Sequence, residues 1–208
     1  MKQLTANITG LTTRSDAPAA TLMNSAEDLV ARARSGDDEA FRLFFERYAR
    51  PVTSFIYDMT GEHHAAEELA QETFVRAYKS LGTFRGAGKA STWLFGIAKN
   101  VAREAIRARH RDNHHVSIDD QAVINLRGAQ LTPDACFLNK ELDRVIHDAL
   151  RTLDEDKRLV FTLKVFQQWS YEEIAEVTGM SIPKVKTDLH RARIEMRRLM
   201  RPYMGVVR

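Results

Sequence analysis

Apolar residues recur at helical spacing along most of this chain, and that periodicity restricts the fold more than any other feature of the sequence. The spacing i, i+3, i+4, i+7 places side chains on one face of an α-helix, and it is first followed by Phe41, Phe44, Phe45 and Tyr48. The same spacing resumes after Pro51, a residue that we expect to interrupt or kink the helix. No segment shows the alternating pattern that is typical of a half-buried strand. The sequence therefore predicts an all-α protein.

Capping residues indicate where the first helices begin and end. Ser25, with Asp28 three residues later, is typical of a helix start. Gly61 is expected to end the helical stretch that contains Pro51. A third helix is predicted over about 64–81, with Gly82 directly after it.

A fourth helix is predicted to begin after Ser91 or Thr92, with a basic outward face. Its inward residues are Leu94, Ile97, Ala98, Val101 and Ala105, and its outward residues are Gly96, Lys99, Asn100, Arg103 and Arg107. A cationic glycine-containing loop precedes it, flanked by Phe84 and Trp93. Aromatic side chains beside cations can hold unstacked nucleotides. The alternative is that both aromatic residues belong to the hydrophobic core.

The periodicity is lost between residues 111 and 133, which are rich in His, Asp, Asn and Gln. A loop of about 20 residues is long for the interior of a compact domain and favours a domain boundary, although 121–126 could form a short helix. We predict two helical domains joined by a flexible linker. The predicted parts are a disordered extension over 1–24, a first domain over 25–111, a linker over 112–135 and a second domain over 136–208.

The second domain ends in the layout of a helix-turn-helix over 171–199. It follows two apolar helices expected over 138–153 and 157–166. Its expected capping and turn residues are Ser170, Glu173, Gly179, Ser181 and Pro183. The glycine is needed because the turn passes through a left-handed conformation.

The last helix has one apolar and one polar face. Val185, Leu189, Ala192 and Met196 form the predicted buried face. The opposite face presents Lys184, Lys186, Thr187, His190 and Arg191, which suit base edges and phosphates in a major groove. Asp188 lies near this basic side and argues against a purely electrostatic contact. The alternative is a solvated amphipathic helix.

Charge is distributed unevenly although the whole chain carries only +3. Residues 58–72 hold five acids and no Lys or Arg, whereas 85–111 and 181–208 each carry a net charge of +6. The two basic zones suggest two contacts with a polyanion. The acidic zone, which includes Glu67, Glu68, Gln71 and Glu72, would repel phosphates and suits a protein partner with a basic rim. Ordinary solvation of an exposed helix is the alternative.

Several classes of protein are disfavoured. The single Cys136 excludes an internal disulfide framework and a multi-thiolate zinc site. The sequence contains neither a membrane-spanning stretch nor a recognisable secretory signal, so we expect a cytoplasmic protein without membrane insertion. Adjacent histidines such as His63 and His64 diverge by about 100° on a helix, which disfavours a helical metalloenzyme. We expect no catalytic residue, metal or cofactor.

These motifs together resemble bacterial ECF sigma factors of the sigma-70 family. Region 2 of that family is similar to DEAF at 38–41, AEELAQETF at 66–74, TWL at 92–94 and IAKN at 97–100. Region 4 is similar to SYEEIA at 170–175 and HRAR at 190–193. The similarity covers about 25–110 and 138–200, in the family's order.

The resemblance implies a subunit that binds core RNA polymerase and directs it to promoters, and that an anti-sigma factor could regulate. The residues implied in docking on the clamp helices of the largest polymerase subunit are Glu67, Glu68, Gln71 and Glu72. Those implied at the −10 element are Phe84, Arg85, Lys89, Trp93, Lys99, Asn100, Arg103 and Arg107. Those implied at the −35 element are Lys184, Lys186, Thr187, His190 and Arg191.

One further alternative is a helix-turn-helix regulator whose first domain senses a signal or dimerises. It accounts for the second domain, but it does not explain a second basic helix that follows a cationic glycine loop. Tight binding of duplex operator DNA without polymerase would favour it.

Overall fold

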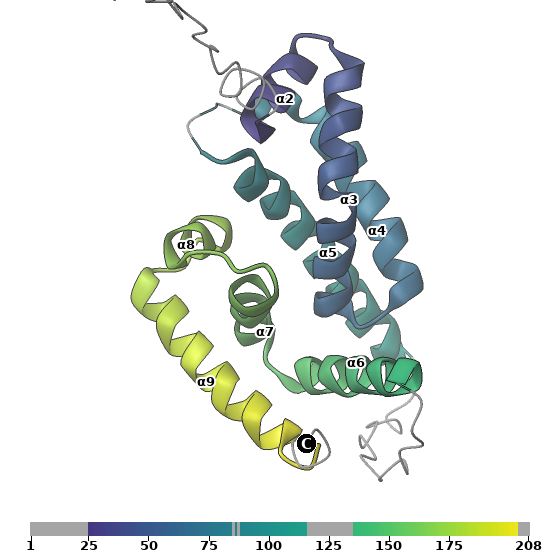
Figure 1. The fold of residues 1–208 in the computed structure, drawn as a ribbon, viewed down its shortest axis with the longest axis vertical. Coiled ribbons are helices and arrows are strands. Elements are labelled where there is room, and N and C mark those ends of the chain that lie inside the picture. The colour runs from purple at the N-terminus through teal and green to yellow at the C-terminus, as the bar shows by residue number, and fades with distance from the viewer. Residues whose placement is uncertain (1–24, 85, 87, 116–134, 204–208) are drawn as a thin grey trace, which may run out of the picture.

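The computed structural model describes residues 25–84, 86, 88–115 and 135–203, and all regular structure in these ranges is helical (Figure 1). The predicted extension over 1–24, the possible helix over 121–126, most of the predicted linker and Arg85 lie outside the described residues. The helical prediction is confirmed for the described ranges.

The first unit contains four α-helices and one 3₁₀ turn. They are α2 (Ala26–Arg34), α3 (Asp38–Thr60), α4 (His63–Lys79), η1 (Leu81–Thr83) and α5 (Ala90–His115). The predicted start at Ser25 is confirmed, because its Oγ accepts a hydrogen bond from the Asp28 backbone N–H at 3.1 Å. Gly61 ends α3 with φ at 76°, the left-handed conformation that a glycine adopts without strain.

The expected interruption at Pro51 is wrong, because α3 runs through it without a break. Proline removes one backbone hydrogen bond from a helix interior. Three of the residues that follow, Val52, Phe55 and Ile56, are completely buried. Packing of this apolar face therefore outweighs the local preference of proline.

The predicted end of the third helix and the predicted start of the fourth are also wrong. Helix α4 ends at Lys79 with Ser80 as its C-cap, and Gly82 lies within η1. Helix α5 begins at Ala90, before either predicted N-cap. Its first N–H donates to Glu27 Oε1 of α2 at 3.0 Å, and this cap comes from a residue 63 positions away. Local sequence patterns carry no signal for such a cap.

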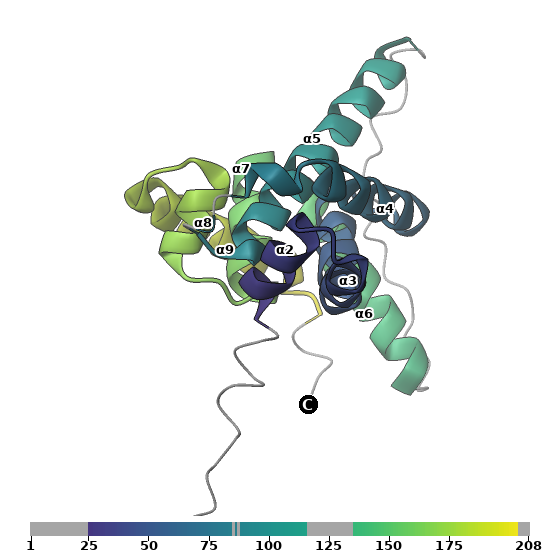
Figure 2. The ribbon, with the colours of Figure 1, turned by 90° about the horizontal axis from the view of Figure 1, so that it is seen from above.

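Helix α5 also continues to His115, four residues past the predicted domain end at 111. Its last turns project from the bundle (Figure 2). Arg107, Arg109 and Arg111 on these turns are exposed. The basic zone of the first unit is therefore carried partly on a projecting helix end.

The second unit consists of α6 (Ala135–Thr152), α7 (Glu155–Phe161), the π-helical segment η2 (Thr162–Phe166), α8 (Tyr171–Thr178) and α9 (Ile182–Met200). The helix expected over 157–166 begins two residues earlier, and its second half is the π-helical segment. The predicted capping box is confirmed, since Ser170 and Glu173 exchange hydrogen bonds of 3.2 and 2.8 Å. Gly179 follows α8 with φ at 72°.

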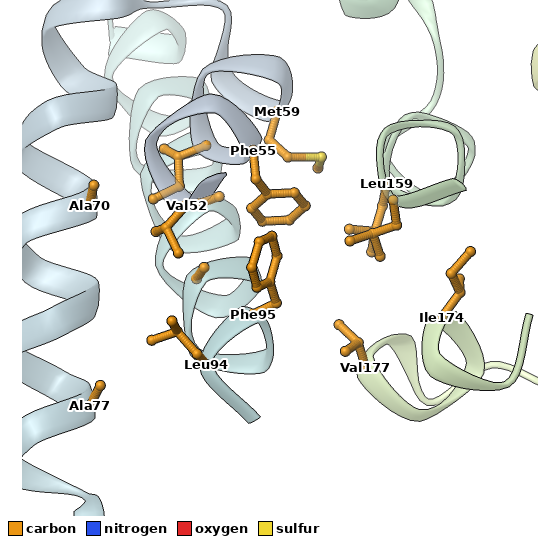
Figure 3. Packing of buried hydrophobic residues seen from close by; sticks show 14 of the residues in the cluster. Val52, Phe55, Met59, Ala70, Ala77, Leu94, Phe95, Leu159, Ile174 and Val177 are labelled. Atoms are coloured by element: carbon orange, nitrogen blue, oxygen red, sulfur yellow. The ribbon is translucent and has the colours of Figure 1, made fainter. Parts of the chain in front are cut away.

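The two units pack against each other around one continuous core. The rings of Phe55 and Phe95 lie 5.3 Å apart between α3 and α5, and Trp169 of the second unit lies 4.9 Å from Phe95. Figure 3 shows Leu159 and Val177 of the second unit facing the Phe55–Phe95 pair. Because α8 packs on α5 and the first turn of α7 binds Arg103, the second unit covers part of the basic helix.

Candidate nucleic-acid interface

The predicted recognition helix α9 has the two faces that the sequence indicates. Its four predicted inward residues are all buried: Val185, Leu189, Ala192 and Met196. The five predicted outward residues are all exposed: Lys184, Lys186, Thr187, His190 and Arg191. The structure therefore leaves a basic, hydrogen-bonding surface facing away from the core, which we call the α9 face.

Asp188 does not belong to that exposed face. It is 8% exposed and lies with the buried residues of α9. Its carboxylate bonds the ammonium group of Lys184, one turn earlier, and Asp156 of α7 binds the same Lys184 Nζ at 3.0 Å. Of the five residues of the α9 face, Lys184 is thus the one held in ion pairs within the described part of the chain.

The outward face predicted for α5 is only partly exposed. Asn100 and Arg107 are exposed, but Lys99 and Arg103 are half-buried beneath the second unit, so their predicted outward position is wrong in this arrangement. The physical reason is that α8 packs on α5 and the first turn of α7 binds Arg103, contacts that the sequence did not predict. We call Lys89, Lys99, Asn100, Arg103 and Arg107 the α5 face.

The covered cations of the α5 face are bound by groups of the second unit. Lys99 Nζ donates to the Val177 carbonyl at 2.7 Å, and Arg103 binds Asp156 at 3.0 Å and also Glu155. Burial, together with the nearby Arg103 charge, lowers the pKa of Lys99 below its usual value. A cation positioned here is therefore less favourable than it would be in water.

At the start of α5, Lys89 Nζ lies 2.6 Å from Glu173 Oε1 of α8. This ammonium group and the Ser170 backbone N–H hold the pKa of Glu173 at about 2. Glu173 therefore serves both as a helix cap within α8 and as a partner for the other unit.

A cavity of about 470 Å³ opens between α5 and α8. Phe84, Trp93, Lys99 and Asn100 line it from the first unit, and Glu176 and Val177 line it from the second. Phe84 is buried, so it contributes to the core, whereas Trp93 is half-buried, with its ring 5.6 Å from that of Phe84. The alternative that these aromatic residues belong to the core is therefore confirmed for Phe84, and Trp93 packs against the same core.

The predicted acidic surface lies on α4. Glu67, Glu68, Gln71 and Glu72 are all exposed, and Glu72 binds Arg76 at 2.6 Å. Asp58, the first acid of the zone, is instead buried and binds His147 Nε2 of α6 at 2.9 Å. Burial raises the pKa of Asp58 in spite of that contact. The acidic surface is consequently smaller than the charge pattern indicates.

An apolar groove that the sequence analysis missed adjoins these acids. It has a volume of about 350 Å³ and is lined by Phe41, Phe45, Gln71, Phe74, Val75, Tyr78 and Lys79. Val75 and Tyr78 are each about half exposed. Their spacing after Gln71, at i+4 and i+7, could have indicated an apolar stripe on the exposed side of α4.

Neither a metal cluster nor a membrane-crossing helix occurs in the part of the chain that the structure describes. There, no three His, Cys, Asp or Glu side chains are grouped closely enough to hold a metal ion. The helices in the same ranges lack the length and apolar character that a membrane crossing requires.

Two family models match the chain, one on each unit. Sigma-70 region 2 matches residues 44–112, and Sigma-70, region 4 matches residues 143–196. The RNA polymerase sigma-H factor of Pseudomonas aeruginosa is 31% identical over 184 residues, which are 86% of this chain and 95% of that protein. The chain belongs to the ECF sigma factors of the sigma-70 family.

Other ECF sigma factors extend this finding. The ECF RNA polymerase sigma-E factor of Haemophilus influenzae is 31% identical over 85% of this chain and 95% of its own length. The structure of CnrH in complex with the cytosolic domain of CnrY matches with a TM-score of 0.66 and 25% identity, over 85% of this chain and 97% of that one. As an ECF sigma factor, the chain directs the initiation of transcription by RNA polymerase.

Proposed function

We propose that this ECF sigma factor binds promoter DNA through two separate basic faces and core RNA polymerase through the acidic side of α4. The observation that carries the proposal is the α9 face, on which five predicted DNA-contacting side chains are exposed together on a helix whose other side is buried.

The α9 face is proposed to read the −35 element. Thr187, His190 and Arg191 offer a hydroxyl, an imidazole and a guanidinium to base edges in the major groove. Lys186 is suited to a phosphate, which fixes the position of the helix without reading sequence. Lys184 is paired with Asp156 and Asp188, so we assign it a smaller share of the contact.

The α5 face is proposed to hold the −10 element and its unpaired strand. Lys99, Arg103 and Arg107 provide cations along one side of α5, and Asn100 provides an amide that can read a base. Trp93 borders the cavity beside them and provides a surface for stacking, and the buried Phe84 packs against its ring. Lys89, an exposed cation directly before α5, is assigned to the same contact. Arg85 is assigned to it from its position in the sequence alone.

The exposed acids of α4 are proposed to dock on the clamp helices of the largest polymerase subunit. Glu67, Glu68, Gln71 and Glu72 form a surface that repels DNA and complements a basic protein. Polymerase would then hold both DNA-binding faces at once, so that two weak contacts act as one selective attachment.

The remaining assignments follow from this function. We assign 25–111 to region 2, 136–208 to region 4 and 112–135 to the segment between them, and leave 1–24 as an extension. We infer a cytoplasmic location, because a sigma factor acts on transcription of the chromosome. We also infer that the chain acts by binding, without a catalytic site. A solved relative from Bartonella quintana, at a TM-score of 0.61 and 25% identity, is in complex with the anti-sigma factor NepR. An anti-sigma factor is therefore a proposed partner here.

Run-off transcription with purified core polymerase and a promoter library tests the proposal. The wild type should select a set of promoters that share two spaced elements. Arg191→Ala should weaken selection at the upstream element without loss of core binding, whereas Arg198→Ala, an exposed residue of the last turn of α9, should not. Unchanged promoter choice with Arg191→Ala would contradict the α9 assignment.

The α4 assignment has its own test. Reversing Glu67 and Glu68 to Lys should reduce association with core polymerase in a pull-down, because two exposed carboxylates change sign. Glu46→Lys, an exposed acid on α3, serves as the control. Undiminished association of the Glu67/Glu68 variant would remove α4 from the docking surface.

A further inference from the structure

We propose that His147 of α6 and Asp58 of α3 share one proton, and that this proton makes the contact between the two units sensitive to pH. Helix α6 crosses the C-terminal end of α3, where the pair lies (Figure 1). This contact is separate from those that α7 and α8 make with α5. The inference does not depend on the roles proposed for the α5 and α9 faces.

Both ring nitrogens of His147 face groups that accept hydrogen bonds. Nε2 lies 2.9 Å from Asp58 Oδ1, and Nδ1 lies 2.6 Å from the carbonyl oxygen of Asp143, one turn earlier on α6. A neutral imidazole carries one N–H, so it can satisfy only one of these two oxygens if Asp58 is ionised. The geometry therefore requires one proton more than a neutral histidine and a carboxylate supply, held either on the imidazole or on Asp58.

Burial makes the loss of that proton unfavourable. The side chain of His147 is 15% exposed and that of Asp58 is 6% exposed. Asp58 Oδ2 is also buried and has no hydrogen-bond partner among the described residues. Without the shared proton, one of the two His147 contacts would bring lone pairs together, and the Asp58 carboxylate would stay buried without an opposite charge. Separation of α6 from α3 would return both side chains to water.

The ring of Tyr57 on α3 completes the surroundings of the pair. Its centroid lies 4.1 Å from that of His147 and 4.7 Å from that of His63 on α4. Burial and nearby carboxylates raise the pKa of Tyr57, so this phenol stays neutral near pH 7. Asp58 and Asp143 are the charged groups that act on His147, and both favour the imidazolium.

Two arginines of the second unit also reach the end of α3. Arg151 of α6 lies against Gly61, and Arg158 of α7 donates to the Met59 carbonyl at 2.5 Å. Neither forms an ion pair with Asp58 in the part of the chain that the structure describes. The buried carboxylate therefore depends on His147 for its compensating charge.

The direction of the pH effect follows from the proton count. A separated aspartate is ionised at neutral pH and a separated histidine is largely neutral, whereas the packed pair holds the extra proton. Burial lowers the pKa of His147, but hydrogen bonds to Asp58 and to the Asp143 carbonyl raise it above its usual value. The pair therefore supports packing fully below pH 6.5, and this support is lost as the pH rises through the raised value. A rise in pH favours separation of the units.

The test measures separation in the full-length chain by energy transfer between dyes on Glu68→Cys and Arg198→Cys, in a Cys136→Ser background. Both labelled positions are exposed, one on α4 and one on α9. We expect the ratio of separated to packed chains to rise between about pH 6.5 and 8.5, by at most about tenfold per pH unit, because one proton is exchanged. A ratio that does not change with pH would overturn the proposal.

Asp58→Asn removes the need for the shared proton. The asparagine NH₂ can donate to Nε2 of a neutral His147, whose Nδ1–H still donates to the Asp143 carbonyl. In this variant the ratio of separated to packed chains should therefore change by less than about twofold over the same pH range. A pH dependence as steep as that of the wild type would contradict the shared proton.

The matched control is His63→Gln. His63 is an exposed histidine that contacts the same Tyr57 ring and forms no ion pair within the described residues. Its replacement removes an imidazole close to the pair and should leave the pH dependence of the wild type unchanged. Loss of the dependence in this variant would assign it to His63 and overturn the proposal. Because these measurements use neither DNA nor polymerase, their failure would leave the proposed function intact.

Discussion

The α5 face and the α9 face carry similar charge but differ in their surroundings. Each belongs to a zone with a net charge of +6. On α9, Thr187, His190 and Arg191 are exposed, whereas on α5 Lys99 and Arg103 are half-buried against the other unit. Charge in the sequence therefore indicates which surfaces suit DNA, and tertiary packing decides which of them is free.

The largest expected change in DNA binding distinguishes the two faces in the free chain. Arg191→Ala should weaken binding of promoter duplex by about tenfold, since one bidentate base contact contributes about 1–3 kcal/mol. Lys99→Ala should change the same measurement very little, because Lys99 is already bound to the Val177 carbonyl. In the holoenzyme, by contrast, both substitutions should reduce run-off transcription. Equal effects of the two in the free chain would remove the distinction between the faces.

The next effect concerns the contact that covers α5. Trp169→Ala removes a half-buried ring that packs on Phe95, and we expect a loss of about 2–3 kcal/mol in the free energy of unfolding. Hydrogen exchange of α5 should increase at the same time, whereas exchange of α3 should change less. Phe166→Ala, a more exposed ring of the second unit, is the control. If α5 exchange does not respond, Trp169 does not hold the units together.

The smallest effect comes from the pair between His147 of α6 and Asp58 of α3. Burial lowers the pKa of His147, but hydrogen bonds to Asp58 and to the Asp143 carbonyl outweigh it, so the pKa is raised above 6.5. The stabilisation is therefore complete below pH 6.5 and is lost as the pH rises through the raised value.

Comparison of the wild type with His147→Gln provides the measurement. The difference in their free energies of unfolding, measured with denaturant, should be about 1 kcal/mol below pH 6.5. It should shrink as the pH increases toward 8.5. A difference that stays constant with pH would show that His147 acts only through packing, including its ring contact with Tyr57 at 4.1 Å.

The sequence could predict features that neighbouring residues determine. The capping box of Ser170 and Glu173, the turn at Gly179 and the buried side of α9 all follow from spacing within one or two helical turns. The exposure of the acids on α4 could be predicted for the same reason.

The features that the sequence could not predict depend on residues far apart in the chain. Asp156 and Arg103 are 53 positions apart, and Lys89 and Glu173 are 84 apart. Nothing in the local pattern around Arg103 shows that an acidic helix start will pack on it. The missed continuity of α3 through Pro51 has the same origin, because burial against other helices decided it.

The carboxylate of Glu27 at the start of α5 has a consequence for how a nucleic acid strand can approach. One N–H group at the positive end of that helix, that of Ala90, already has this carboxylate as its acceptor. Helix α9 differs, because Ser181 provides no side-chain acceptor for its first turn. Under the proposed function, a backbone phosphate can therefore reach the N–H groups at the start of α9, whereas one such N–H of α5 already has an acceptor.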